Sequence, residues 1–117
     1  MTNARRVVEE HLDAFNAHDT ARLLAGFPAD AVWATGRDVV RGRAALADLF
    51  DDGLWRLEPY LELRSLVAAD DLVAAELIET ITIDGARTRF DIAVFFTIRA
   101  DRIATAKVYR EGTAELG

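Results

Sequence analysis

The sequence predicts a single α+β domain in which helices come first and an antiparallel sheet follows. Apolar residues recur at helical spacing as far as residue 54, and from residue 60 onward they alternate with polar residues. Short turn motifs divide the alternating region into four strands. Helices followed by an antiparallel meander are typical of the α+β class, so we expect the helices to cover one face of a curved sheet.

Length and composition fit one domain over residues 1–117. The chain has 117 residues, and the 51% that are hydrophobic suffice for a core at this size. There is no cysteine, which excludes disulfides and thiolate chemistry and fits a reducing compartment. No secretion signal or membrane-spanning apolar run is visible, so we expect a cytoplasmic protein without a membrane partner.

The charge balance argues against nucleic acid as a partner. Fourteen basic and 20 acidic residues give a net charge of −6, and an acidic surface repels phosphate backbones. The basic residues are also scattered along the chain rather than gathered into one stretch.

Three helices are predicted in the first half of the chain. Residues 4–18 form the first, and residues 21–27 form a second that Asp19 or Thr20 caps and that Gly26 and Pro28 end. Residues 43–54 form the third, which Gly53 stops. A short strand at 31–35 and a loop at 35–42 lie between the second and third helices.

Four strands are predicted in the second half, at 59–68, 72–83, 87–99 and 102–110, with tight turns between them. The strand at 87–99 is apolar on both faces, since Ala93 and Phe95 alternate with the Phe90–Ile98 set. A strand of this kind is buried on both faces. We therefore expect a homodimer through the outer sheet face, and a thick monomeric core is the alternative.

His11 interrupts the apolar stripe of the first helix. Such a histidine is either a core residue with a satisfied hydrogen bond or a group that faces a pocket. Glu79 interrupts the apolar face of its strand in the same way, so it needs a partner, which is either His11 or an arginine.

Four motifs in order resemble the NTF2-like superfamily, in its SnoaL-like and ketosteroid-isomerase-like branch. They are "AFNAHD", "FPADAVW", "GRAALADLF" and "RADRIATAKVY", and they cover nearly the whole chain. The resemblance implies a cone, in which a strongly curved antiparallel sheet wraps around three N-terminal helices. It also implies a pocket between the first helix, the third helix and the concave sheet face, and homodimers through the outer face.

The resemblance also implies positions for site residues. In the alignment with ketosteroid isomerase, His11 occupies the position of the tyrosine that binds the substrate oxyanion. Ala93 occupies the position of the protonated aspartate, and Thr35 occupies the position of the general base. The last-strand aspartate of the limonene-epoxide hydrolases falls on Val108. Both known catalytic sets are therefore broken, and this chain carries different chemistry or none.

We expect His11, with Glu79 or Asp91, to form an acid/base set in the cone. Burial lowers the pKa of an imidazole and a nearby carboxylate raises it. Arg89 is a candidate cation for Asp91, although the two residues also suit an exposed cross-strand pair. The candidate substrate-binding residues are Phe15, Trp33, Thr35, Asp38, Phe50, Trp55, Tyr60, Ala93, Phe95 and Val108. Asp38 is alternatively a loop residue without a role in binding. Trp33, Trp55 and Tyr60 alternatively lie in the core or at its rim.

No metal and no cofactor are predicted. His11 and His18 lie two helical turns apart, roughly 10 Å, and the sequence has no zinc or nucleotide motif. The predicted function is a small metal-free enzyme that performs acid/base chemistry, of the isomerase, cyclase, dehydratase or epoxide-hydrolase type, on a hydrophobic small molecule. The alternatives are a non-catalytic small-molecule-binding domain and a dimerisation domain with a filled cone.

Overall fold

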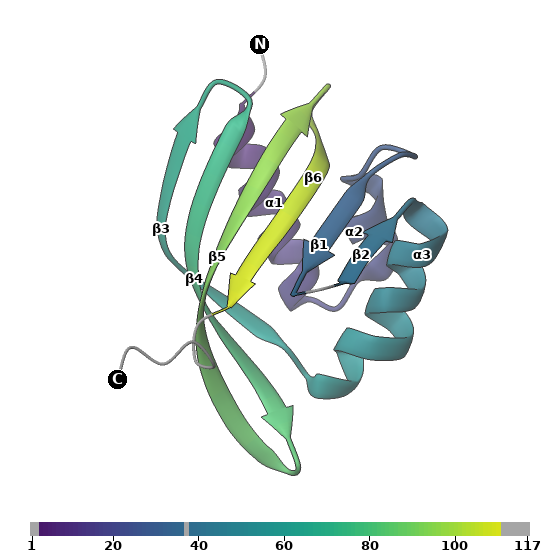
Figure 1. The fold of residues 1–117 in the computed structure, drawn as a ribbon, viewed down its shortest axis with the longest axis vertical. Coiled ribbons are helices and arrows are strands. Elements are labelled where there is room, and N and C mark those ends of the chain that lie inside the picture. Colours follow the sequence, from purple (N-terminus) through teal and green to yellow (C-terminus); the bar gives the residue numbers. More distant parts are fainter. Residues whose placement is uncertain (1–2, 37, 111–117) are drawn as a thin grey trace.

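The computed structural model describes residues 3–36 and 38–110, and it has the predicted α+β architecture (Figure 1). Its helical elements are α1 (Ala4–Asn16), α2 (Thr20–Ala25), α3 (Arg43–Asp48), a π-helical turn η1 (Leu49–Gly53) and a 3-10 turn η2 (Leu54–Leu57). Its strands are β1 (Val32–Thr35), β2 (Asp38–Arg41), β3 (Tyr60–Ala69), β4 (Leu72–Ile83), β5 (Ala86–Arg99) and β6 (Arg102–Arg110). The strands form one six-stranded sheet in the order β2-β1-β6-β5-β4-β3.

The sheet is antiparallel at every junction except one. Strands β3 to β6 form the expected meander, and β1 pairs in parallel with β6. The loop expected at 35–42 is wrong in part, because residues 38–41 form β2. Val39 and Val40 are β-branched, and their backbone extends the sheet by pairing with β1.

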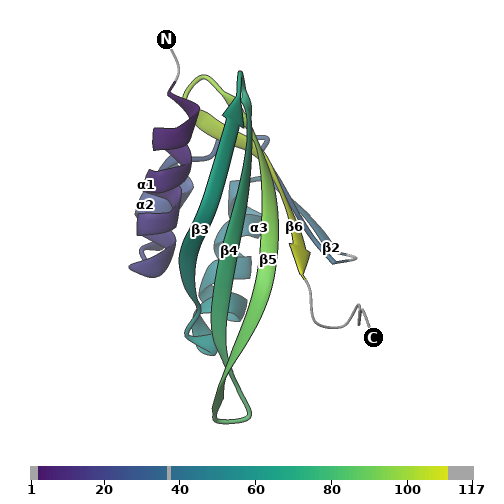
Figure 2. The ribbon, with the colours of Figure 1, turned by 90° about the vertical axis from the view of Figure 1, so that its left-hand side faces the viewer.

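The sheet curves around the helices (Figures 1 and 2). Register shifts in β3, between Leu63 and Ser65, and beside the β5–β6 turn bend the strands locally. The hairpin turns fall where the sequence predicts them. Asp84 and Gly85 have φ values of 50° and 81°, as a tight two-residue hairpin turn requires.

Helix α1 packs against the concave sheet face and positions the site. Asn3 caps it by accepting a hydrogen bond from the Arg6 backbone N–H at 3.1 Å. At its other end the Asn16 side chain donates to the Leu61 carbonyl at 2.9 Å and accepts from the Leu61 N–H at 2.8 Å. Both helix ends are therefore fixed, and the buried stripe of α1, His11 included, faces the sheet.

The third predicted helix, 43–54, is regular only to Asp48 and continues as η1 and η2. Contacts with a distant part of the chain explain why the regular helix ends there. The Trp55 indole N–H donates to the Thr20 hydroxyl at 2.9 Å, and that hydroxyl donates to Asp51 at 2.5 Å. These bonds tie the end of the segment to α2, and Gly53, a weak helix former, tolerates the change of path.

Aromatic side chains fill the space between this segment and the sheet. Phe50 lies 5.6 Å from Trp33 and 5.5 Å from Trp55, measured between ring centroids. Phe15 lies 5.2 Å from Trp55. Phe50 is fully buried, so this cluster forms the end of the core beside the cone's cavity.

Candidate functional site

A small cavity of about 50 Å³ lies inside the cone, between α1, the η1–η2 segment and the inner face of β4, β5 and β6. Most of its lining is aliphatic or aromatic. The ionisable and hydroxyl-bearing residues in the lining are His11, Thr35, Glu79 and Arg110. A cavity of this size holds about one or two water molecules.

Glu79 provides a buried carboxylate at this cavity. It lies on the inner face of β4 and is only 5% exposed. The Arg110 guanidinium donates two hydrogen bonds to one of its oxygens, Oε1, from Nε at 3.0 Å and from Nη2 at 2.6 Å. Arg110 also lies over the Phe90 ring, 5.7 Å from its centroid. This pairing supplies the compensation that a buried carboxylate needs.

The second carboxylate oxygen of Glu79, Oε2, accepts no hydrogen bond from Arg110. Within residues 3–36 and 38–110, no side chain or backbone group donates a hydrogen bond to Oε2. The arginine therefore fixes the carboxylate through one oxygen and leaves the other as an acceptor. Because Glu79 lines the cavity, a molecule placed there has access to a carboxylate in an apolar surrounding.

His11 provides the second buried polar group, and it is 6% exposed. Its ring lies among the side chains of Phe15, Phe27, Trp33 and Phe96, at centroid distances from 5.5 to 6.4 Å. Across the part of the chain that the structure describes, its nitrogens form no hydrogen bond. Burial lowers the pKa of His11 to about 4, so the imidazole is neutral at pH 7. No hydrogen bond within residues 3–36 and 38–110 supports the alternative of a hydrogen-bonded core histidine.

Four predicted substrate-binding residues line the cavity: Phe15, Trp33, Thr35 and Val108. Thr35 and Val108 are directly opposite each other in the β1–β6 ladder, so their side chains share the inner face. Phe50 and Trp55 belong to the aromatic cluster that packs behind Phe15.

Three predicted site residues lie on the other side of the sheet, and their expected position is corrected. Asp91, Ala93 and Phe95 alternate with the inward-facing Ile92 and Val94, so their side chains point outward. Asp91 and Ala93 border a separate hollow on β5 and β6. Asp91 therefore does not join His11 and Glu79, and Arg89 has no carboxylate partner among the described residues.

Two further expected positions are also corrected. Tyr60 is 53% exposed, because it pairs with Thr80, on the outer face of β4. Asp38 is exposed at the start of the edge strand β2, and neither residue borders the cavity.

Arg110 is the charged cavity residue that sequence reasoning missed. It is the last residue of β6, and its alternation with the inward-facing Val108 places a cation on the inner face. That period-two pattern was the available signal. Leu49 and Leu54 were also missed, because only the break of the third helix brings both to the cavity.

Two other kinds of feature are absent from the described ranges, 3–36 and 38–110. No group of three or more His, Cys, Asp or Glu residues there is arranged to hold a metal ion. No helix there is long and apolar enough to cross a membrane.

Comparison with known proteins identifies relatives of the fold. A family model described as SnoaL-like domain matches residues 8–106. No curated protein matches the chain significantly in sequence. An LEH-like epoxide hydrolase from M. tuberculosis superposes with a TM-score of 0.84 at 24% identity, over 92% of this chain and 82% of that one.

Two more solved structures are similar to this chain. SalBIII, an epoxide hydrolase/cyclase-like enzyme in pyran ring formation in the polyether salinomycin, has a TM-score of 0.86 at 24% identity, over 94% of this chain and 92% of its own. TerC, co-crystallised with polyporic acid, has a TM-score of 0.85 at 16% identity, over 95% of this chain and 93% of its own. At these identities the likeness shows the NTF2-like fold.

Proposed function

This chain belongs to the SnoaL-like family, and we propose that it is an enzyme that performs acid/base chemistry on a hydrophobic small molecule inside the cone. The observation that carries the proposal is the buried carboxylate of Glu79. Arg110 holds one of its oxygens, and the other has no donor among the described residues. A carboxylate kept ready in an apolar cavity is a general base that needs neither metal nor cofactor.

His11 supplies the complementary group. A neutral imidazole donates an N–H hydrogen bond, and in an apolar site such a bond stabilises a developing oxyanion. Glu79 would accept a proton from a C–H beside a carbonyl, or from the water that opens an epoxide. His11 would meanwhile donate to the oxygen on which negative charge accumulates. The proton returns from Glu79 to the product, so the step balances without another reactant.

The lining indicates the class of substrate. Apart from four polar residues, the cavity presents aliphatic and aromatic side chains, which suit a hydrophobic molecule. Ligand sites usually measure about 300–1,000 Å³, so the 50 Å³ cavity must widen to admit one. The η1–η2 segment carries Leu49 and Leu54 on the cavity wall and is the element we expect to move.

The test is turnover of a panel of hydrophobic epoxides and polyketide-like ketones, followed by mass spectrometry. We expect the wild-type protein to convert at least one compound. Glu79→Gln should bind that compound and convert it at least about 100-fold more slowly, in line with removal of a general base. Glu76→Gln is the matched control, because Glu76 is exposed on the outer face of the same strand, and it should retain full turnover.

Two results would contradict the enzyme proposal. Binding of a compound without conversion would make this protein a small-molecule-binding domain. Equal turnover in wild type and Glu79→Gln would remove Glu79 from the chemistry.

The outer sheet face supports a second proposal, a homodimer. Phe95 and Tyr109 are 43% and 49% exposed, and their rings contact each other with centroids 5.8 Å apart. Leu72 and Val67 extend this exposed apolar face toward β3. A second copy would cover these side chains.

For the cellular location we propose the cytoplasm, which fits a chain without cysteine.

A further inference from the structure

One wall of the cone cavity is formed by a segment with little buried surface. Residues 51–57 lie between two fully buried residues, Phe50 and Pro59, and Leu54 from this segment lines the cavity. None of residues 51–57 is itself buried. Segments with few buried contacts open at the lowest free-energy cost in a folded protein. Among the described elements around the cavity, this segment is therefore the one that opens most easily.

The chain is fixed immediately after this segment. The Glu58 carbonyl accepts a hydrogen bond from the Arg87 guanidinium at 2.7 Å. The Pro59 carbonyl accepts one from His18 Nε2 at 2.9 Å. Because the residue before the segment is fully buried as well, movement of this wall is confined to residues 51–57, which we call the flap.

A single hydroxyl holds the flap closed. The Thr20 hydroxyl accepts a hydrogen bond from the Trp55 indole N–H at 2.9 Å and donates one to Asp51 Oδ1 at 2.5 Å. The His18 ring also stacks on Trp55, with 4.6 Å between the ring centroids and 16° between the ring planes. Asp51 begins the flap and Trp55 lies in its second half, so one side chain holds both parts.

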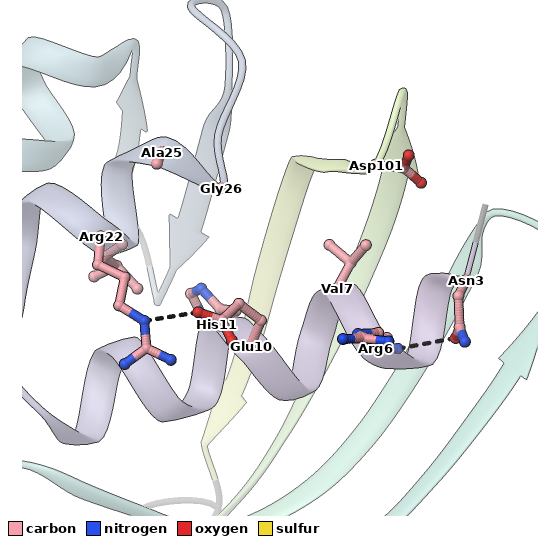
Figure 3. Close-up of a pocket in the computed structure, with 10 residues that line it drawn as sticks. Asn3, Arg6, Val7, Glu10, His11, Arg22, Ala25, Gly26 and Asp101 are labelled. Carbon is pink, nitrogen blue, oxygen red and sulfur yellow. Dashed lines mark hydrogen bonds and ion pairs between the residues drawn. The ribbon is translucent and has the colours of Figure 1, made fainter.

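The helix that carries this hydroxyl is fixed in turn. Thr20 is the first residue of α2, and Asp19 caps this helix by accepting a hydrogen bond from the Arg22 backbone N–H at 3.1 Å. The Arg22 side chain donates to the Glu10 carboxylate of α1 at 2.7 Å, which joins the two helices (Figure 3). Leu23 of α2 is only 1% exposed. Helix α2 therefore stays in place when the flap moves.

We propose that the flap opens to admit the ligand of the cone cavity, and that Thr20 controls this opening from outside the cavity. The inference rests on the proposed function, because it concerns the same cavity, and it limits the moving part of η1–η2 to the residues after Phe50. Leu54 leaves the cavity wall when the flap opens, so the 50 Å³ cavity widens toward the volume of a small-molecule site, about 300–1,000 Å³. Thr20 does not line the cavity and is a positioning residue.

Cysteine labelling tests the flap without any substrate. The chain has no cysteine, so Val94→Cys places a single thiol on the cavity wall, at a position that is 3% exposed. Iodoacetamide reacts with this thiol only when the cavity opens. At low urea concentrations the labelling rate should be independent of urea, because opening of the flap exposes little surface. Val73→Cys, in the core outside the cavity lining, should react only on global unfolding and accelerate steeply with urea.

Removal of the Thr20 hydroxyl should speed the labelling of Val94→Cys. Thr20→Val keeps the shape of the side chain and loses two hydrogen bonds, so labelling at low urea should be about tenfold faster. Asp51→Ala loses one of these bonds and should give about a threefold increase. Thr20→Ser retains the hydroxyl and should keep the original rate. Ser65→Ala is the control, because the Ser65 hydroxyl bonds to Glu76 on the outer sheet face, and it should leave the rate unchanged.

Three results would overturn the proposal. Equal labelling rates with and without the Thr20 hydroxyl would place the entrance of the cavity elsewhere. A rate that rises with urea as steeply as that of Val73→Cys would show that the cavity opens only on global unfolding. An equal acceleration in Ser65→Ala would make the effect one of stability alone. Absence of turnover with the compound panel would contradict the enzyme proposal and leave these labelling rates unchanged, so the two failures are distinguishable.

Discussion

At the scale of single residues, this domain keeps two polar groups in its core under opposite conditions. Glu79 is buried with a cationic partner, and Arg110 is 36% exposed, so the pair joins the cavity to the surface. The His11 ring is buried beside the aromatic rings of Phe27, Trp33 and Phe96, and within residues 3–36 and 38–110 it forms no hydrogen bond. Arg110 supplies the opposite charge that the buried Glu79 carboxylate needs, and burial lowers the pKa of the His11 imidazole, which is therefore neutral at pH 7.

The unpaired imidazole predicts a specific pH dependence of stability. The pKa of His11 is lowered from 6.5 to about 4 in the folded state, so below about pH 6.5 the unfolded chain takes up a proton that the folded chain does not. Acid therefore destabilises the fold between about pH 6.5 and pH 4, by about 3 kcal/mol in total. Below pH 4 this contribution levels off.

Urea denaturation at a series of pH values measures this effect. His11→Leu removes the titrating group while it keeps an apolar side chain of similar size, so its stability should fall less than that of wild type between pH 6.5 and pH 4. His18→Gln is the control, since the His18 ring is partly exposed and hydrogen-bonded to the Pro59 carbonyl. Identical pH profiles for wild type and His11→Leu would contradict a buried neutral imidazole.

At the scale of elements, the position of α1 relative to β3 depends on one side chain. Asn16 closes a ring of two hydrogen bonds with the Leu61 backbone, 45 residues away in sequence. Asn16→Ala should therefore lower the free energy of unfolding by about 2 kcal/mol, since two bonds are lost and backbone groups are left without partners.

The control for this prediction is Asp13→Ala, an exposed substitution on the same helix, which should change stability by less than about 0.5 kcal/mol. Because Asn16 also fixes the helix that carries His11, the loss should be accompanied by a change in the His11 ring signal. A fully stable Asn16→Ala would show that packing alone positions α1.

The sequence predicted elements well wherever one periodicity dominated. The period of two in residues 60–110 gave the four meander strands and the inner position of Glu79, because one residue in two must face the helices. The same period did not show which face of β5 points inward, because β5 carries apolar residues on both faces. Asp91 and Ala93 were placed inward by family resemblance, whereas the Phe90–Ile98 set faces inward.

Contacts distant in sequence explain the remaining differences. β2 exists because β1 offers it a free edge, and the third helix ends early because Trp55 and Asp51 bond to Thr20. Neither contact leaves a periodic trace in the sequence. Arg110 did leave such a trace, as an inward-facing position two residues after Val108, and only its place at the end of a strand obscured it.

At the scale of the whole molecule, the sheet has one face that its own chain covers and one that it leaves exposed. Helices pack on the inner face, as Figure 2 shows, and the outer face of β3 to β6 carries Val67, Leu72, Phe95 and Tyr109 with large exposed fractions. The Phe95 and Tyr109 rings contact each other, with Lys107 beside both, and we propose that this face is an interaction site. In the proposed homodimer a second copy would bring an identical face, and two-fold symmetry would let each face cover the other.

The proposed dimer predicts a change of mass on a single substitution. Wild type should sediment at twice the chain mass, and Phe95→Glu should sediment as a monomer, because two-fold symmetry places two buried carboxylates in one interface. Phe95 is 43% exposed within one chain, so circular dichroism should show an intact fold. Ile83→Glu is the control, since Ile83 is 40% exposed but lies at the tip of β4, and it should remain dimeric. A wild-type protein that sediments as a monomer at every concentration would refute the dimer and leave the outer face for another partner.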